Sequence, residues 1–175
     1  MTLLGLLAIG LCLRVAISDL YARRVPNAWL LAACVLALPW LLVSQLTATP
    51  QPLAAHLLGA VLGLLALLPF HLLRMMGAGD VKFFAVLGLL LGWQALLPVW
   101  IVASLAAGLH AGIVVASRLL APRLPATLQA QHWQAHPALR DMQQARQGRK
   151  GAPYASYLAL AAIGWLLVTT YGGAA

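Results

Sequence analysis

The feature that most constrains this sequence is a series of apolar runs, each close to the length that a helix needs to cross a bilayer. A spanning α-helix takes about 20 predominantly apolar residues. Six such runs cover approximately residues 3–17, 28–46, 53–73, 81–97, 98–120 and 154–171. We therefore predict an all-α, polytopic membrane protein of about six transmembrane helices. Only Gly92–Gln94 and Pro98 separate the fourth and fifth runs, so five helices with one long kinked segment is the alternative.

The composition agrees with a lipid environment. Hydrophobic residues make up 63% of the chain and charged residues only 8%, whereas soluble domains are about 25% charged. The net charge of +8 raises nucleic-acid binding as a possibility, but the basic residues lie between the apolar runs and form no basic face with interleaved aromatics. We expect no nucleic-acid partner.

The basic residues predict the orientation of the chain. Apart from Arg14, they occur in or beside the first, third and fifth connections between runs, and the other two connections carry no charge. Positive loops face the cytoplasm, so we expect the N-terminus to lie outside the cytoplasm. The first run begins at Thr2 without a basic n-region and ends at Ser18–Asp19, and we expect it to remain as the first helix rather than to act as a signal peptide.

One membrane-embedded domain, 1–175, is expected, with a polar cytoplasmic loop at about 121–153. His132 and His136 in this loop have the i, i+4 spacing of two metal ligands on a helix. Pro137 adjoins them and no third ligand is apparent. We therefore expect no metal site. Cys12 and Cys34 lie inside apolar runs and are interpreted as packing residues.

Two carboxylates mark the candidate site. The chain has three acidic residues, and two of them, Asp19 and Asp80, stand at ends of apolar runs, on the cytoplasmic side by the charge argument. Carboxylates at such positions are costly and are functional candidates. A carboxylate pair can act as base and acid in peptide hydrolysis, relay protons in a transporter, or form ion pairs with nearby basic residues. Composition and topology leave these three uses open.

The sequence around the aspartates favours the first use. Asp80 lies in Gly77-Ala78-Gly79-Asp80-Val81-Lys82, where Gly77 and Gly79 permit a tight backbone and close approach of a substrate strand. Lys82 either tunes Asp80 or binds lipid phosphate. Asp80 opens a helix and Asp19 ends one, so the helix dipoles predict Asp80 as the base and Asp19 as the acid.

The segments SDLYARRVPN (18–27) and GAGDVKFFAVLGLLLG (77–92) resemble the signatures of the type IV prepilin peptidases, membrane aspartic peptidases with a GxGD motif. The residues opening the last run, Gly151–Tyr154, are similar to a third signature. This resemblance implies a catalytic pair of Asp19 and Asp80, with Gly77 and Gly79 shaping the loop and no cofactor.

The resemblance also implies a multi-pass protein of the bacterial inner membrane that cuts prepilin or pseudopilin leaders at the cytoplasmic face. Its partners would be the prepilin, membrane lipid and pilus or secretion assembly proteins. The chain lacks the paired CxxC motifs of the longer family members and is similar to the short, tight-adherence (Flp) form. N-methylation is therefore not expected.

Two rival functions remain open. A proton-coupled transport subunit would use the two aspartates as a relay and needs further polar residues at mid-membrane depth. An inactive scaffold of pilus assembly would keep the fold but not the chemistry. The small residues of the apolar runs are interpreted as helix-packing contacts, namely Gly59, Gly63, Ala103, Ala107, Gly108 and Gly112.

Overall fold

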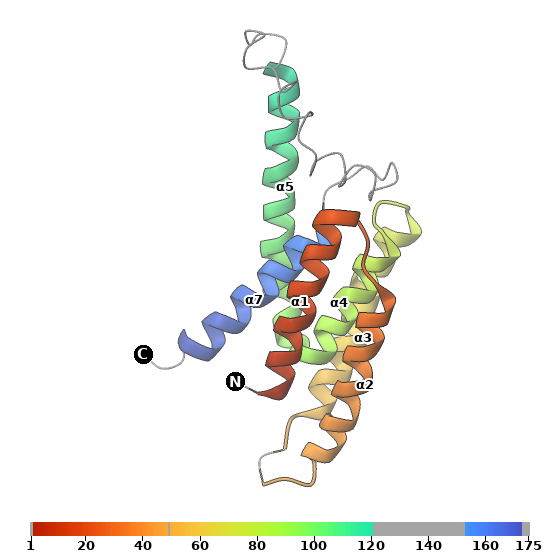
Figure 1. Ribbon diagram of the computed structural model, residues 1–175, viewed down its shortest axis with the longest axis vertical. Coiled ribbons are helices and arrows are strands. Elements are labelled where there is room, and N and C mark those ends of the chain that lie inside the picture. Colours follow the sequence, from red (N-terminus) through yellow and green to blue (C-terminus); the bar gives the residue numbers. More distant parts are fainter. Residues whose placement is uncertain (1, 49, 121–152, 173–175) are drawn as a thin grey trace.

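The computed structural model describes residues 2–48, 50–120 and 153–172, with the side chains of 118 and 120 excepted. This part of the chain is all-helical (Figure 1). Its elements are α1 (Leu3–Ala22), α2 (Asn27–Ser44), α3 (Leu53–Leu72), α4 (Ala78–Leu91), the 3₁₀ turn η1 (Trp93–Ala95), α5 (Leu96–Leu120) and α7 (Tyr154–Tyr171).

Of the six α-helices in the described residues, five are long and apolar enough to cross a membrane, and the shorter α4 is not one of them. The prediction of an all-α, polytopic membrane protein is confirmed. His132, His136 and the predicted loop 121–153, except its last residue, lie outside the described residues.

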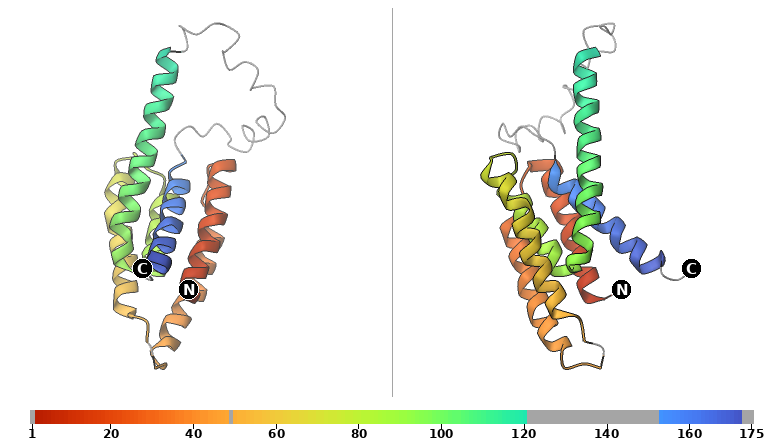
Figure 2. Two further views of the ribbon diagram at one scale, coloured as in Figure 1. Left: turned by 90° about the vertical axis from the view of Figure 1, so that its left-hand side faces the viewer. Right: turned by 180° about the vertical axis from the view of Figure 1, so that it is seen from behind.

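The helices run alternately up and down the bundle (Figures 1 and 2). The connections α1–α2 and α3–α4 therefore lie at one end of the bundle, which we call the basic end because it carries Arg23, Arg24 and Arg74. The connections α2–α3 and α4–α5 lie at the opposite end. The C-terminal end of α1 meets the N-terminal ends of α4 and α7 at the basic end (Figure 1).

The short helix α4 lies in the core. Eight of its residues are buried, among them Phe83 and Phe84, which are 0% and 1% exposed. A helix that is apolar all round needs partners on all sides, and α4 contacts α1, α2, α3 and α7. The core therefore fixes the position of the N-terminal turn of α4.

Glycines bring α3 and α4 into backbone contact. A Cβ at Gly59 would collide with the carbonyl group of Gly88, and one at Gly88 with that of Gly59. The packing role predicted for Gly59 is thus confirmed, as small residues allow close approach of helices in membranes. The same prediction is wrong for Gly108 and Gly112 within the described residues, since a Cβ added at either would meet nothing within 4 Å beyond the backbone of its own helix.

The boundary between the fourth and fifth predicted helices is also corrected. We expected them at about 81–97 and 98–120, but α4 ends at Leu91 and α5 begins at Leu96. Gly92 ends α4 because it adopts φ +82°, a conformation that L side chains rarely reach. Pro98 does not separate the helices and lies in the first turn of α5, where a proline is tolerated.

Candidate active site

Asp19 is positioned by the last turn of α1. The helix ends at Ala22, and its C-cap residue Arg23 adopts a left-handed conformation with φ 53° and donates its N–H to the Asp19 carbonyl oxygen at 3.0 Å. The hydroxyl of Ser18 donates to the carbonyl oxygen of Arg24 at 2.9 Å. These bonds fold the α1–α2 connection back beside the end of α1. The side chain of Asp19 is 7% exposed.

Asp80 is positioned by the first turn of α4. Gly77 is the N-cap residue, with extended backbone at φ −71° and ψ 142°, and its carbonyl oxygen accepts the Asp80 N–H at 3.1 Å. The Asp80 carboxyl in turn interacts with the backbone of Gly77. The Asp80 side chain thus reaches back to the cap residue as the third helical residue of a capping box does, while Gly77 uses its backbone carbonyl in place of a cap side chain.

The two glycines of this turn lie close to neighbouring side chains. A Cβ at Gly77 would lie 3.3 Å from Asp80 Oδ2, and a Cβ at Gly79 would lie 3.0 Å from the Cβ of Val25 in the α1–α2 connection. Neither glycine has a positive φ. Gly77 thus leaves the Asp80 carboxylate open, and Gly79 lets α4 approach the connection.

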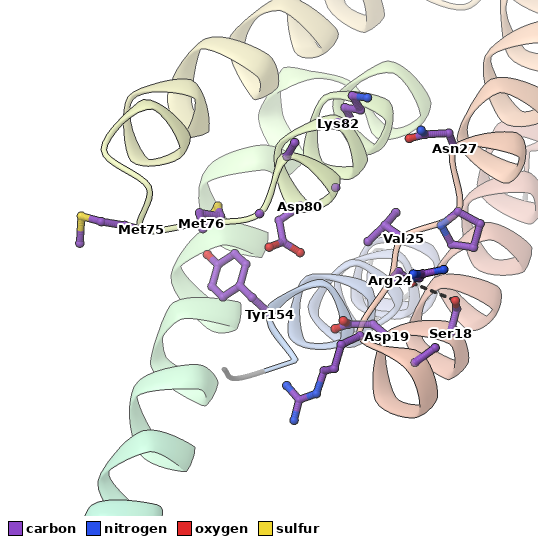
Figure 3. A pocket seen from close by; sticks show the side chains of 16 residues that line it. Ser18, Asp19, Arg24, Val25, Asn27, Met75, Met76, Asp80, Lys82 and Tyr154 are labelled. Carbon is purple, nitrogen blue, oxygen red and sulfur yellow. Dashed lines mark hydrogen bonds between the residues drawn. The ribbon is translucent and has the colours of Figure 1, made fainter. Parts of the chain in front are cut away.

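One pocket of about 1050 Å³ receives both aspartates. The lining includes every residue that the sequence analysis selected for the site, namely Asp19, Gly77, Gly79, Asp80 and Lys82. Figure 3 shows the two carboxylates pointing toward the same space, with the ring of Tyr154 beside Asp80. Residues 61 positions apart in sequence thus share one cavity at the basic end.

The first turn of α7 completes the site. The backbone N–H of Ser156 donates to Asp19 Oδ2 at 3.0 Å, and the Ser156 hydroxyl lies 3.0 Å from the same oxygen. The hydroxyl of Tyr154 forms a hydrogen bond of 3.1 Å with the hydroxyl of Ser104 on α5. The sequence analysis missed Ser156, although a serine in the first turn of an otherwise apolar helix is a signal for a polar partner nearby.

The electrostatics of the pair differ from the dipole-based expectation. Asp80 lies outside the five long apolar helices, and its pKa is raised from 3.8 to about 6. Burial is the main cause, and the negative charge of Asp19 is the second. Hydrogen bonding by the backbones of Gly77 and Ala155 acts in the opposite direction. This shift favours a protonated Asp80, whereas the helix dipole predicted an ionised one.

The described residues do not bring three His, Cys, Asp or Glu side chains together as a metal site requires. The pocket brings two carboxyl groups together, and one of them, Asp80, is readily protonated near neutral pH.

The comparison with known families agrees with the two sequence signatures. A sequence model described as the type IV leader peptidase family matches residues 6–112. The match covers more than half of the chain and includes Asp19 and Asp80, but it ends before α7. No curated protein and no solved structure matches the chain.

Proposed function

The chain belongs to the type IV leader peptidase family, and we propose that it is a membrane aspartic endopeptidase that uses Asp19 and Asp80 to cleave the leader peptides of Flp-like prepilins or pseudopilins. The observation that carries this proposal is the shared pocket, in which the charge of Asp19 raises the pKa of Asp80. A pair of carboxyl groups that share one proton is the machinery of aspartic peptidases. In this proposal, residues 1–175 act as one peptidase domain.

The proposed reaction starts with Asp19 ionised and Asp80 protonated. Asp19 takes a proton from a water molecule as the water oxygen bonds to the scissile carbonyl carbon, and Asp80 gives its proton to the carbonyl oxygen. The tetrahedral intermediate then collapses as Asp19 passes its proton to the amide nitrogen and the C–N bond breaks. One hydroxyl of the intermediate returns a proton to Asp80, which restores the starting state.

The shape and position of the pocket support a peptide substrate. Its volume of about 1050 Å³ is at or above the ~300–1,000 Å³ of pockets that hold drug-sized ligands, so a short extended stretch of chain can enter. The basic connections beside it support a cytoplasmic location by the positive-inside rule. A prepilin with its apolar helix in the bacterial inner membrane would present its leader junction at this level.

The test is cleavage of a co-expressed prepilin, read by gel shift and by the mass of the new N-terminus. Wild type is compared with Asp19→Asn and Asp80→Asn, and Asp141→Asn serves as the control because Asp141 is the third acidic residue of the chain. We expect wild type and Asp141→Asn to cut at the leader junction, and the other two variants to insert in the membrane without cutting.

Normal cutting by both Asp19→Asn and Asp80→Asn would refute a catalytic role of the pair. A proton relay would then become the better explanation, and proteoliposomes loaded with a pH-sensitive dye would measure it. Absence of cutting by wild type, with the same prepilin cut by a known leader peptidase, would instead support the inactive scaffold.

A further inference from the structure

Arg14 of α1 and Trp29 of α2 form an exposed cationic pair on two helices that contact each other. The guanidinium carbon of Arg14 lies 5.1 Å from the centroid of the Trp29 ring. Trp29 is the third residue of α2 and is 46% exposed. The pair therefore lies within one turn of the end of α2 that belongs to the basic end of the bundle. Neither side chain lines the pocket of the two aspartates.

The charge of Arg14 has no counter-ion in the described part of the chain. Its side chain interacts there with the Trp29 ring, and the indole N–H of Trp29 meets no acceptor among the same residues. A guanidinium carries five N–H donors in a planar fork that matches a phosphate group. A charge at a membrane helix is costly unless it is paired. The pair thus presents donors to an anionic group supplied from outside the described residues.

An apolar groove lies farther along α1 and α2. It has a volume of about 360 Å³, and it is lined by Leu3, Leu7, Leu36, Pro39, Trp40 and Val43, none of which is charged. Leu7 precedes Arg14 by seven residues, and Leu36 follows Trp29 by seven. Seven residues are about two helical turns, so these side chains lie on the same helix faces as the cationic pair. Because the helices are antiparallel, both steps lead away from the basic end.

We propose that this face of α1 and α2 binds an anionic phospholipid, with its phosphate at Arg14 and Trp29 and an acyl chain in the groove. The order of polar and apolar groups matches a lipid of the leaflet at the basic end, whose phosphate lies at the interface and whose chains point toward the bilayer centre. A zwitterionic lipid fits less well. Both acidic side chains that the structure describes, Asp19 and Asp80, line the other pocket, so none of them is placed to pair with an ammonium group here.

The test is lipid binding to the purified, delipidated protein in detergent, measured by native mass spectrometry during titration with dioleoyl phosphatidylglycerol. No prepilin is present, so the result does not depend on the proposed peptidase function. Arg14→Gln should weaken the tightest binding by roughly tenfold or more, because a hydrogen-bonded charge pair is lost. Arg74→Gln is the matched control, since it removes the same charge from an exposed residue at the same end. At near-physiological ionic strength, screening should limit its effect to about twofold.

A second variant covers the case that Arg14→Gln does not fold. Arg14→Lys keeps the charge but loses the planar fork and its stacking on the ring, and we expect several-fold weaker binding. Equal weakening by the variants of Arg14 and Arg74 would overturn the site, because it would indicate only a general attraction of anionic lipid to the basic end.

Two further probes test the identity of the ligand. Dioleoyl phosphatidylcholine should bind more weakly than phosphatidylglycerol, and so should a phosphatidylglycerol with two hexanoyl chains, which fill less of the groove. Equal binding of the two dioleoyl lipids would overturn the assignment of an anionic lipid. Inorganic phosphate should not displace the lipid at matched concentrations, and displacement would show that the site binds phosphate alone.

Discussion

The substitution Gly63→Ala tests whether the contact between α3 and α4 positions Asp80. A Cβ at Gly63 would lie 2.8 Å from the carbonyl oxygen of Phe84 and 3.0 Å from the Cα of Ala85. Both atoms belong to the backbone of α4 and cannot rotate away. Ordinary contact begins at 3.4 Å, so the two helices must separate locally by about 0.6 Å. Phe84 lies one helical turn after Asp80, and the shift is therefore transmitted to the carboxylate.

Two opposing effects set the stability of this variant. Overpacking of a core costs about 1–3 kcal/mol, while replacing glycine by alanine inside a helix contributes up to about 1 kcal/mol of stability. The control Gly112→Ala on α5 receives only the second effect, since within the described residues its added Cβ would meet nothing within 4 Å beyond the backbone of its own helix. The difference between the two variants should thus be about 1–3 kcal/mol.

The assay combines thermal unfolding in detergent with prepilin cleavage. We expect Gly63→Ala to unfold at a lower temperature than Gly112→Ala. Because a displacement of about 1 Å can cost 100-fold in rate, the smaller displacement here should slow cleavage by roughly tenfold. The reasoning is wrong if Gly63→Ala unfolds no earlier than Gly112→Ala and cuts at the wild-type rate.

Three further predictions concern the pocket. The raised pKa of Asp80 means that ionised Asp80 destabilises the fold, so wild type should lose stability as pH rises through about 6. At pH 8 the free energy of unfolding of Asp80→Asn should therefore exceed that of wild type by about 3 kcal/mol, and the variant should unfold at a higher temperature. Below about pH 4 the same melts should show no difference. Gly79→Ala should slow prepilin cleavage because its Cβ would lie 3.0 Å from the Cβ of Val25; the double variant with Val25→Gly, which removes that Cβ, should restore the rate, and failure of this rescue would contradict the contact. Tyr154→Phe loses the bond to Ser104 and should unfold with about 1 kcal/mol less stability in urea, whereas an unchanged midpoint would show that the bond contributes nothing.

Much of the fold can be predicted from the sequence because the bilayer restricts it. A chain with several long apolar runs must form helices, since lipid cannot satisfy backbone polar groups. The same rule does not say which helix lies in the core. The short helix α4 has an apolar sequence similar to its neighbours, and only the structure reveals that Phe83 and Phe84 are fully buried.

Glycine pairs illustrate a second limit of sequence analysis. Gly59 and Gly63 on α3 and Gly108 and Gly112 on α5 have the same four-residue spacing. The first pair contacts the backbone of α4, whereas neither member of the second contacts a neighbour in the described part of the chain. Spacing predicts that a face can pack closely, but the presence of a partner depends on the three-dimensional arrangement.

The sequence predicts the two aspartates of the candidate site but not the serine that hydrogen-bonds to one of them. Asp19 and Asp80 stand out because carboxylates are rare in this chain. Ser156 does not stand out, as serine is common in helices and its role depends on a contact 137 residues away. The arrangement becomes apparent only when α7 is packed against α1.

Burial is the main cause of the raised pKa of Asp80, and sequence position does not report burial. A helix dipole changes the free energy of a charge by typically 0.3–1 kcal/mol, and on this basis Asp80 at the start of α4 was expected to be the base. The rise of its pKa from 3.8 to about 6 corresponds to about 3 kcal/mol in the opposite direction. The desolvation of Asp80 and the charge of Asp19 together therefore exceed the dipole several-fold. Asp19 accepts hydrogen bonds from the backbone N–H and the hydroxyl of Ser156, which favour its charged form, and in the proposed reaction it is the base.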